Sequence, residues 1–167
     1  MSMLEGESNN YLVAIYPEKT GFGLTACDIS TGELMTTHMD SRAKLSDELS
    51  KLSPKEIILP ISLEDGELFC DISKNYLINT LDDRFFYIEK AKKSIKDFFK
   101  VANLEGFGLS ENNMTYLCIS STGALLNYLE KTQLTDIKHI RNIKTYRREN
   151  YMLLDRSAIA SLELVKN

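Results

Sequence analysis

The sequence lacks the features that mark several classes of protein. Its three cysteines, Cys27, Cys70 and Cys118, stand far apart with no Cys-x-x-Cys pair, so neither a disulfide framework nor a zinc site is indicated. No stretch approaches the roughly 18 consecutive apolar residues of a membrane span, and the N-terminus lacks the basic and apolar regions of a signal peptide. We therefore expect a cytoplasmic protein with reduced thiols.

Positive charge is not in excess either. The 167 residues carry 20 Lys and Arg against 24 Asp and Glu, which gives a net charge of −4. Duplex binding rests largely on clustered cations that neutralise phosphates, so we expect weak or no DNA binding by this chain. The length suits one domain, or one domain with part of another, and 43% hydrophobic residues are enough for a core.

A hairpin is the clearest element that the sequence does contain. Residues 10–16 form an apolar strand that we expect to end at Pro17, which cannot donate to a sheet ladder. Residues 22–29 are strand-prone, Ser30-Thr31-Gly32 supplies turn chemistry, and the chain resumes at 34–38. The pattern predicts an antiparallel meander of three strands.

A helix and a parallel strand should follow the meander. Asp40 or Ser41 can cap a helix that places Leu45, Leu49 and Leu52 on one face. Residues 55–60 form a short strand between prolines, and the helical crossover predicts that it is parallel to an earlier strand.

The middle of the chain is less regular. We expect a loop over 64–67, a short helix over 75–81, an aromatic strand over 84–88 and a helix capped by Ser94. A break at 106–108 precedes the longest periodic segment, an amphipathic helix over 110–133. Gly123 lies inside this helix, where it costs about 1 kcal/mol relative to alanine, which indicates a close approach to another backbone.

The two ends of the chain differ from the middle. Residues 1–8 are interpreted as a polar tail or cloning remnant, which we exclude from the fold. Residues 137–148 are typical of an extended connector and 151–154 of an apolar extended segment. Asp155 can cap a helix that carries Ala158, Ile159 and Leu162 and has no stop signal before residue 167.

This succession of three antiparallel strands, helix, strand, helix, strand and helix matches the ribonuclease H-like fold, a mixed five-stranded sheet flanked by helices. The residues also resemble the connector domain of the MutS family of DNA mismatch repair ATPases. The stretches that carry the resemblance are residues 9–12, 27–33, 54–59, 123–133, 139–140 and 151–155. Together they cover about 9–167, almost the whole chain.

The resemblance implies a domain organisation and a function. Residues 9–144 would be the connector domain, and 145–167 would begin the α-helical core, or lever, domain. The module would be non-catalytic, would link the mismatch-binding domain to the core and ATPase domains, would relay conformational change and would offer a docking surface for MutL. ATP and Mg²⁺ would belong to the parent protein's ATPase domain, because no Gly-x-x-x-x-Gly-Lys-Ser/Thr loop and no Phe-x-Glu motif occur in this chain.

A ribonuclease H-like nuclease is the alternative that the fold class leaves open. Such enzymes hold two metal ions on several carboxylates, the first of them midway along the opening strand. The strand over 11–16 has no acid, and the acids elsewhere are scattered, namely Asp28, Glu33, Glu48, Asp71 and Asp97. We therefore predict no catalytic, cofactor-binding or metal-binding residue, with a nuclease or a free-standing interaction domain as the alternatives.

Other candidate residues have simpler structural interpretations. Asp28 precedes the hairpin turn and should accept backbone N–H bonds there. Cys118 lies on the apolar stripe of a helix and should pack in the core, and His38 and His139 have no third metal ligand near them in sequence.

Two basic clusters complete the set of candidates. Lys90, Lys92, Lys93 and Lys96 should form a solvated face, with a DNA-backbone or partner contact as the alternative. Lys138, Arg141, Lys144, Arg147 and Arg148 should pair with acidic surfaces of a neighbouring domain, with phosphate contact as the alternative. Residues 144–150 are the predicted pivot between the two domains, and a monomer is the default state of this chain.

Overall fold

The computed structural model describes residues 10–132 and 139–147. Its first elements are the predicted meander, with β1 at Tyr11–Glu18, β2 at Gly21–Asp28 and β3 at Glu33–Met39. Pro17 does not end β1, because β4 pairs with β1 only over Leu12–Ala14 and Pro17 lies beyond that doubly paired part. A proline is tolerated where one edge of the strand needs no N–H donor.

The sheet has six strands in the order β5-β4-β1-β2-β3-β6. Strands β4 (Glu56–Pro60) and β5 (Ile78–Leu81) extend it in parallel from β1, as predicted for β4. The sixth strand, β6 (Lys144–Thr145), is parallel to β3 and was not predicted, since only two residues form it. The order of the first five strands fits the ribonuclease H-like succession.

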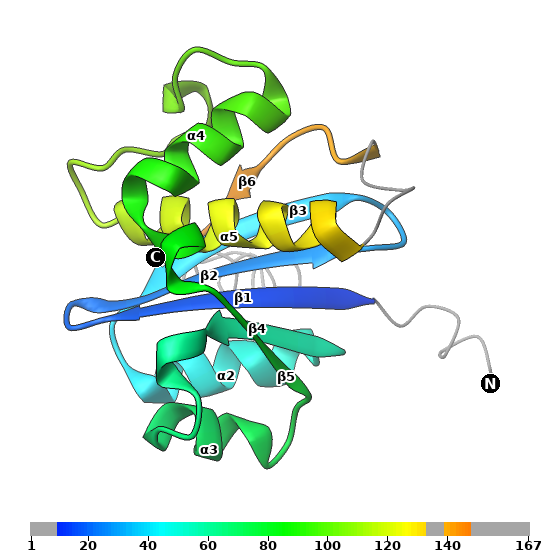
Figure 1. Ribbon diagram of the computed structural model, residues 1–167, viewed down its shortest axis with the longest axis vertical. Coiled ribbons are helices and arrows are strands. Elements are labelled where there is room, and N and C mark those ends of the chain that lie inside the picture. The colour runs from blue at the N-terminus through cyan, green and yellow to red at the C-terminus, as the bar shows by residue number, and fades with distance from the viewer. Residues whose placement is uncertain (1–9, 133–138, 148–167) are drawn as a thin grey trace, which may run out of the picture.

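Helices cover both faces of this mixed α/β sheet, as Figure 1 shows, with α2 (Arg42–Leu52) and α3 (Glu67–Ser73) on one face and α4 (Ile88–Phe99) and α5 (Tyr116–Thr132) on the other. The alternation of side chains along β1 separates two cores. Val13 and Ile15 pack with α2, whereas Leu12 and Ala14 pack with α4 and α5.

The predicted cap and leucine face of α2 are confirmed. The Ser41 hydroxyl accepts the N–H of Lys44 at 3.2 Å, which satisfies one of the free donors of the first turn. Leu45 and Leu49 are buried, and Ser53 ends the helix in the left-handed conformation.

The predicted short helix over 75–81 is wrong. Helix α3 comes earlier, after the short 3₁₀ helix η1 (Ile61–Leu63), and residues 78–81 form β5 instead. The N–H of Ile57 donates to the carbonyl of Leu77 at 2.9 Å, so the free edge of β4 recruits this segment into the sheet. Pairing with a neighbouring strand therefore overrides the weak local preference for helix.

The predicted aromatic strand over 84–88 is also wrong. Residues Asp83–Phe86 form the 3₁₀ helix η2, which the Asp82 carboxylate caps by accepting the N–H of Arg84 at 3.0 Å. Phe85 and Phe86 are both buried, whereas a strand would send adjacent side chains to opposite faces. Ser94 is not a cap, because α4 begins at Ile88 and the Ser94 hydroxyl donates to the Lys90 carbonyl.

Helix α5 confirms the long periodic segment but begins at Tyr116, after a turn that Asn113 and Thr115 stabilise. It is buried on nearly all sides rather than amphipathic, since it lies between the sheet and α4. The close approach predicted at Gly123 is confirmed, because a Cβ there would lie 2.4 Å from the Cα of Ala91 in α4. The predicted break at 106–108 is the 3₁₀ helix η3 (Glu105–Phe107), closed by Gly108.

Buried hydroxyls fix where α5 lies on the sheet. The Thr25 hydroxyl is within 2.9 Å of the Oγ atoms of Thr36, Ser121 and Thr122, and all four residues are fully buried. On the same face, a Cβ on Gly23 would lie 2.1 Å from the carbonyl oxygen of Leu117. The helix therefore sits directly on the backbone of β2.

Some predictions fall outside the described residues. These are the tail over 1–8, the extended segment over 151–154, the Asp155 cap and the helix that comes after it. The two residues on either side of the predicted domain boundary, Lys144 and Thr145, are described, and both pair with β3. None of the helices in the described residues combines the length and hydropathy that a membrane span requires.

Candidate functional site

The acids that a nuclease would need lie on separate elements. Asp28 ends β2, Glu33 begins β3, and Glu48, Asp71 and Asp97 are in α2, α3 and α4. Asp71 is paired with Arg42 at 2.6 Å and Asp97 with Lys93 at 2.9 Å. In the part of the chain that the structure describes, no three His, Cys, Asp or Glu side chains gather closely enough to hold a metal ion.

Asp28 forms the turn as predicted. Its Oδ1 accepts the N–H of Ser30 at 2.9 Å, and its backbone carbonyl accepts the N–H of Gly32 at 2.8 Å. The residue is buried, so the carboxylate is committed to the backbone of the hairpin.

The buried thiols are poor nucleophiles. Cys118 is packed in the core as predicted, and burial raises the pKa of its thiol to about 11. Burial likewise raises the pKa of Cys27 to about 12, while Cys70 is exposed. Because the thiolate is the reactive form, neither buried cysteine is suited to catalysis.

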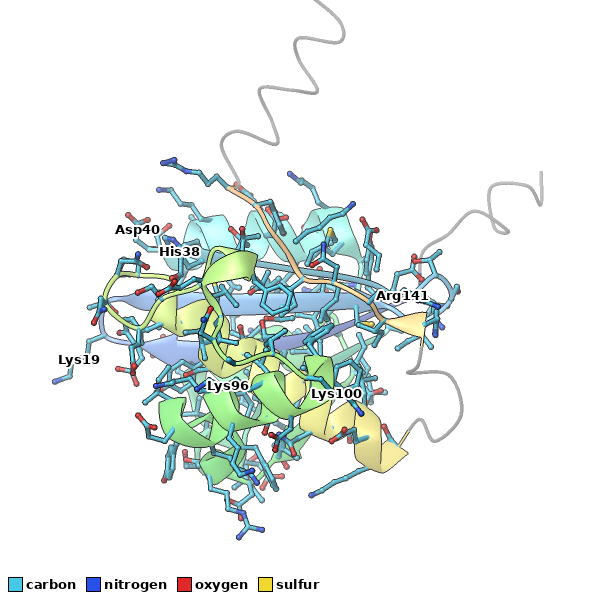
Figure 2. All side chains as sticks on the ribbon, turned by 90° about the horizontal axis from the view of Figure 1, so that it is seen from above. Lys19, His38, Asp40, Lys96, Lys100 and Arg141 are labelled. Carbon is cyan, nitrogen blue, oxygen red and sulfur yellow. The ribbon has the colours of Figure 1, made fainter. Side chains whose placement is uncertain are left out.

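The two histidines lie in different parts of the structure. Burial lowers the pKa of His38 most, and the positive charge of Arg147 lowers it further. In Figure 2 His38 lies near Asp40, toward the opposite end of the sheet from Arg141. His139 instead lies over the hairpin turn, with its Nε2 3.1 Å from the carbonyl oxygen of Ile29.

The basic residues of α4 are largely solvated or paired within the chain. Lys92 is 2.7 Å from Glu111, Lys93 is paired with Asp97, and Lys90 is exposed. Figure 2 places Lys96 and Lys100 on the same helix layer. The predicted solvated face is therefore present for Lys90 and Lys93, whereas Lys92 and Lys96 are partly buried.

Residues 139–147, here called the exit segment, return across the hairpin and dock on the sheet. Gly32 has a φ of +81°, and a Cβ there would lie 2.5 Å from the His139 ring, so the turn and the exit segment touch closely. Ile140 and Ile143 are buried in the core that α4 and α5 cover. Strand β6 then pairs with β3 at Met35 and Thr36.

A polar contact ends this docking on the other face of the sheet. The N–H of Tyr146 donates to the carbonyl of Thr36 at 3.0 Å, and its hydroxyl donates to Glu48 Oε2 in α2 at 2.7 Å. Glu48 is only 1% exposed, and its Oε1 lies 3.8 Å from Lys51 Nζ. The exit segment thus packs against one core and is hydrogen-bonded to α2 on the other face of the sheet. Sequence reasoning missed the second contact because Glu48 and Tyr146 are 98 residues apart.

The second basic cluster lies on this segment. Arg141, Lys144 and Arg147 are exposed, and Lys144 Nζ is 3.3 Å from Glu33 Oε2. Lys138 and Arg148 lie outside the described residues. An acid of the same domain therefore neutralises one of these cations, and two remain directed to solvent.

The fold and these contacts define a class: a three-layer α/β module whose exit segment is built into its own sheet and contacts elements on both of its faces. Comparison with known proteins identifies the family. A sequence model of the family described as MutS domain II matches residues 10–141.

Curated relatives point to the same family. The chain is 37% identical to the DNA mismatch repair protein MutS of Acetivibrio thermocellus, 38% identical to that of Alkaliphilus oremlandii and 34% identical to that of Methanosarcina acetivorans. Each alignment covers 99% of this chain and 19% or 20% of the relative, so the chain spans about one fifth of their length. The chain belongs to the MutS family of DNA mismatch repair proteins, as its domain II.

Proposed function

We propose that this chain is the non-catalytic connector of a MutS-type mismatch repair ATPase. It links the mismatch-binding domain to the core and ATPase domains and relays displacement between them. The observation that carries the proposal is the docked exit segment. Because Ile140, Ile143 and β6 belong to the same packed body as β1–β3, a force on either end of the domain displaces it as a unit.

The docking changes where bending can occur. The predicted pivot covered residues 144–150, but Lys144 and Thr145 are paired with β3, and Tyr146 is bonded to both the sheet and α2. A relay through this body therefore needs its pivot outside residues 139–147.

An insertion in the complete MutS-type polypeptide tests the relay. Three residues, Gly-Gly-Ser, placed directly after Arg147 should uncouple this domain from the core domain. The same insertion between Asn112 and Asn113, both exposed, is the matched control. We expect the first insertion to abolish the stimulation of ATP hydrolysis by mismatched DNA while mismatch binding and basal hydrolysis persist, and the control to leave stimulation unchanged. Equal stimulation in the two variants would refute the relay.

The family resemblance adds MutL as a docking partner of this domain, and that is part of the proposal. Surface plasmon resonance, with a MutL-type protein passed over the immobilised chain, tests this docking. Binding is expected, and the absence of binding to both the chain and the complete polypeptide in its ATP state would remove this part.

The nuclease alternative has its own assay. The purified chain should leave an RNA–DNA hybrid and single-stranded DNA intact in the presence of Mg²⁺ or Mn²⁺. Cleavage that disappears when Asp28 or Glu33 is replaced would replace the connector proposal with an enzyme.

A further inference from the structure

Three cations surround one aromatic ring where η2 meets α4 and α5. Arg84 Cζ lies 5.1 Å from the centroid of the Phe85 ring, Lys90 Nζ 5.5 Å and Lys131 Nζ 4.4 Å. The ring is 7% exposed and packs in the core beneath them. All three positive charges therefore lie within 5.5 Å of the centroid of one nearly buried ring, and we call this group the Phe85 cluster.

Ion pairs within the described residues balance only one of the three cations of this cluster. Asp82 Oδ1 is 4.0 Å from Arg84 Nε, and both side chains are more than half exposed. Lys90 and Lys131 form no ion pair with any residue of 10–132 or 139–147. The face of an aromatic ring attracts cations but carries no net charge. On a chain whose net charge is −4, the cluster thus brings three positive charges together around one ring.

Exposed apolar side chains border the cluster. Among the described residues three large hydrophobic side chains are exposed, and two of them are Tyr87 at 59% and Ile61 at 49%. Tyr87 directly joins η2 to α4. Ile61 begins η1, and the N–H of its neighbour Ser62 donates to the Asp83 carboxylate of η2 at 2.9 Å. Aromatic residues and arginine beside apolar surface are the composition of protein-binding surfaces.

We propose that the Phe85 cluster, with Tyr87 and Ile61, docks an acidic polypeptide segment that also carries apolar side chains. Its carboxylates would meet Arg84, Lys90 and Lys131, and its apolar side chains would cover Tyr87 and Ile61. Charge complementarity selects this occupant. A nucleic acid fits less well, because it has no aliphatic side chains to cover the exposed Ile61.

The test uses the chain itself, so it does not depend on the relay or on MutL. The ¹⁵N-labelled chain is titrated with an eight-residue peptide of five Glu and three Leu, and separately with a single-stranded oligothymidine. Backbone amide shifts report the site, and fluorescence anisotropy of labelled peptide gives the dissociation constant. We expect the peptide to shift the amides of Tyr87, Lys90 and Lys131, with affinity that falls as salt rises.

Two variants with equal loss of charge separate a site from general attraction. Arg84→Gln, Lys90→Gln and Lys131→Gln together remove the cluster. Lys44→Gln, Lys74→Gln and Lys100→Gln remove three cations on α2, after α3 and at the end of α4. Loss of the three cluster charges should raise the dissociation constant of the peptide at least about tenfold. Loss of the three control charges should raise it less than about twofold.

Every other result counts against the proposal. Equal weakening in the two variants would mean unspecific attraction, and peptide shifts centred elsewhere, or none, would remove the site. Tighter binding of oligothymidine than of peptide at the same amides would assign the cluster to nucleic acid instead. Thermal melting of each variant checks that it is folded. If the triple variant melts at a lower temperature than the unchanged chain, the single exposed substitution Lys131→Gln is compared with Lys44→Gln instead.

Discussion

At the scale of single residues, side-chain oxygens decide where the backbone turns. The hairpin turn comes after Asp28 because the carboxylate accepts the N–H of Ser30. The sequence predicts this contact, since an acid followed by Ser-Thr-Gly has a local partner. The sequence could not predict the hydrogen bond between Tyr146 and Glu48, because that bond forms only when the exit segment lies against α2.

Replacement of Asp28 by alanine should destabilise the chain by about 1 kcal/mol, the usual net value of one hydrogen bond and its buried partner. Asp28→Asn keeps an acceptor at the same position and should cost much less. Urea unfolding followed by circular dichroism measures both free energies of unfolding. Equal losses in the two variants would show that the charge, rather than the turn bond, matters.

His38 should make stability depend on pH. Burial and Arg147 lower its pKa below the ordinary value of 6.5, so the unfolded chain binds its proton at higher pH than the folded chain does. The stability that neutral His38 allows is therefore complete above pH 6.5 and falls as pH drops through 6.5 toward the folded pKa. Urea unfolding at about pH 7.5 and about pH 5.5, on either side of that value, should show a smaller loss for His38→Gln than for the unchanged chain. The same loss in both would contradict the assignment.

At the scale of elements, strongly patterned segments were predictable and edge segments were not. The meander, α2, β4 and α5 are predicted by apolar runs, caps and spacing of three and four. The predictions for residues 75–81 and 84–88 were wrong. The first segment pairs with the free edge of β4, and the second forms η2, which buries Phe85 and Phe86 together. Packing partners distant in sequence supplied that information.

The contact between α4 and α5 gives a test at this scale. Gly123→Ala adds a Cβ 2.4 Å from both Cα and Cβ of Ala91, so α4 must move. We expect a loss of about 1–3 kcal/mol, as is typical of overpacking, although alanine is the better helix former. Gly106→Ala, with no atom within 4 Å of the added Cβ, is the control and should change little. Urea unfolding measures both, and a gain in stability at position 123 would show that the helices separate freely.

At the scale of the whole molecule, the exit segment forms part of the sheet, because β6 pairs with β3. Strand β6 contributes only two paired residues, too few for periodicity to reveal, yet it ties the exit segment to β3. The family resemblance predicted the kind of domain correctly, whereas the docking of residues 139–147 emerged only from the structure. This docking makes the relay proposal specific, since it fixes which residues move with the body.

Hydrogen exchange tests that claim most directly. The complete MutS-type polypeptide is exchanged in its ADP-bound, ATP-bound and nucleotide-free states, and uptake is read at the amides of residues 144–146. The account predicts that among these amides the one of Tyr146 is as protected as those of β3 in all three states, because it donates to the carbonyl of Thr36 at 3.0 Å. Exchange at the rate of an unstructured peptide in any one state would contradict it, because the body would then bend within its own exit strand.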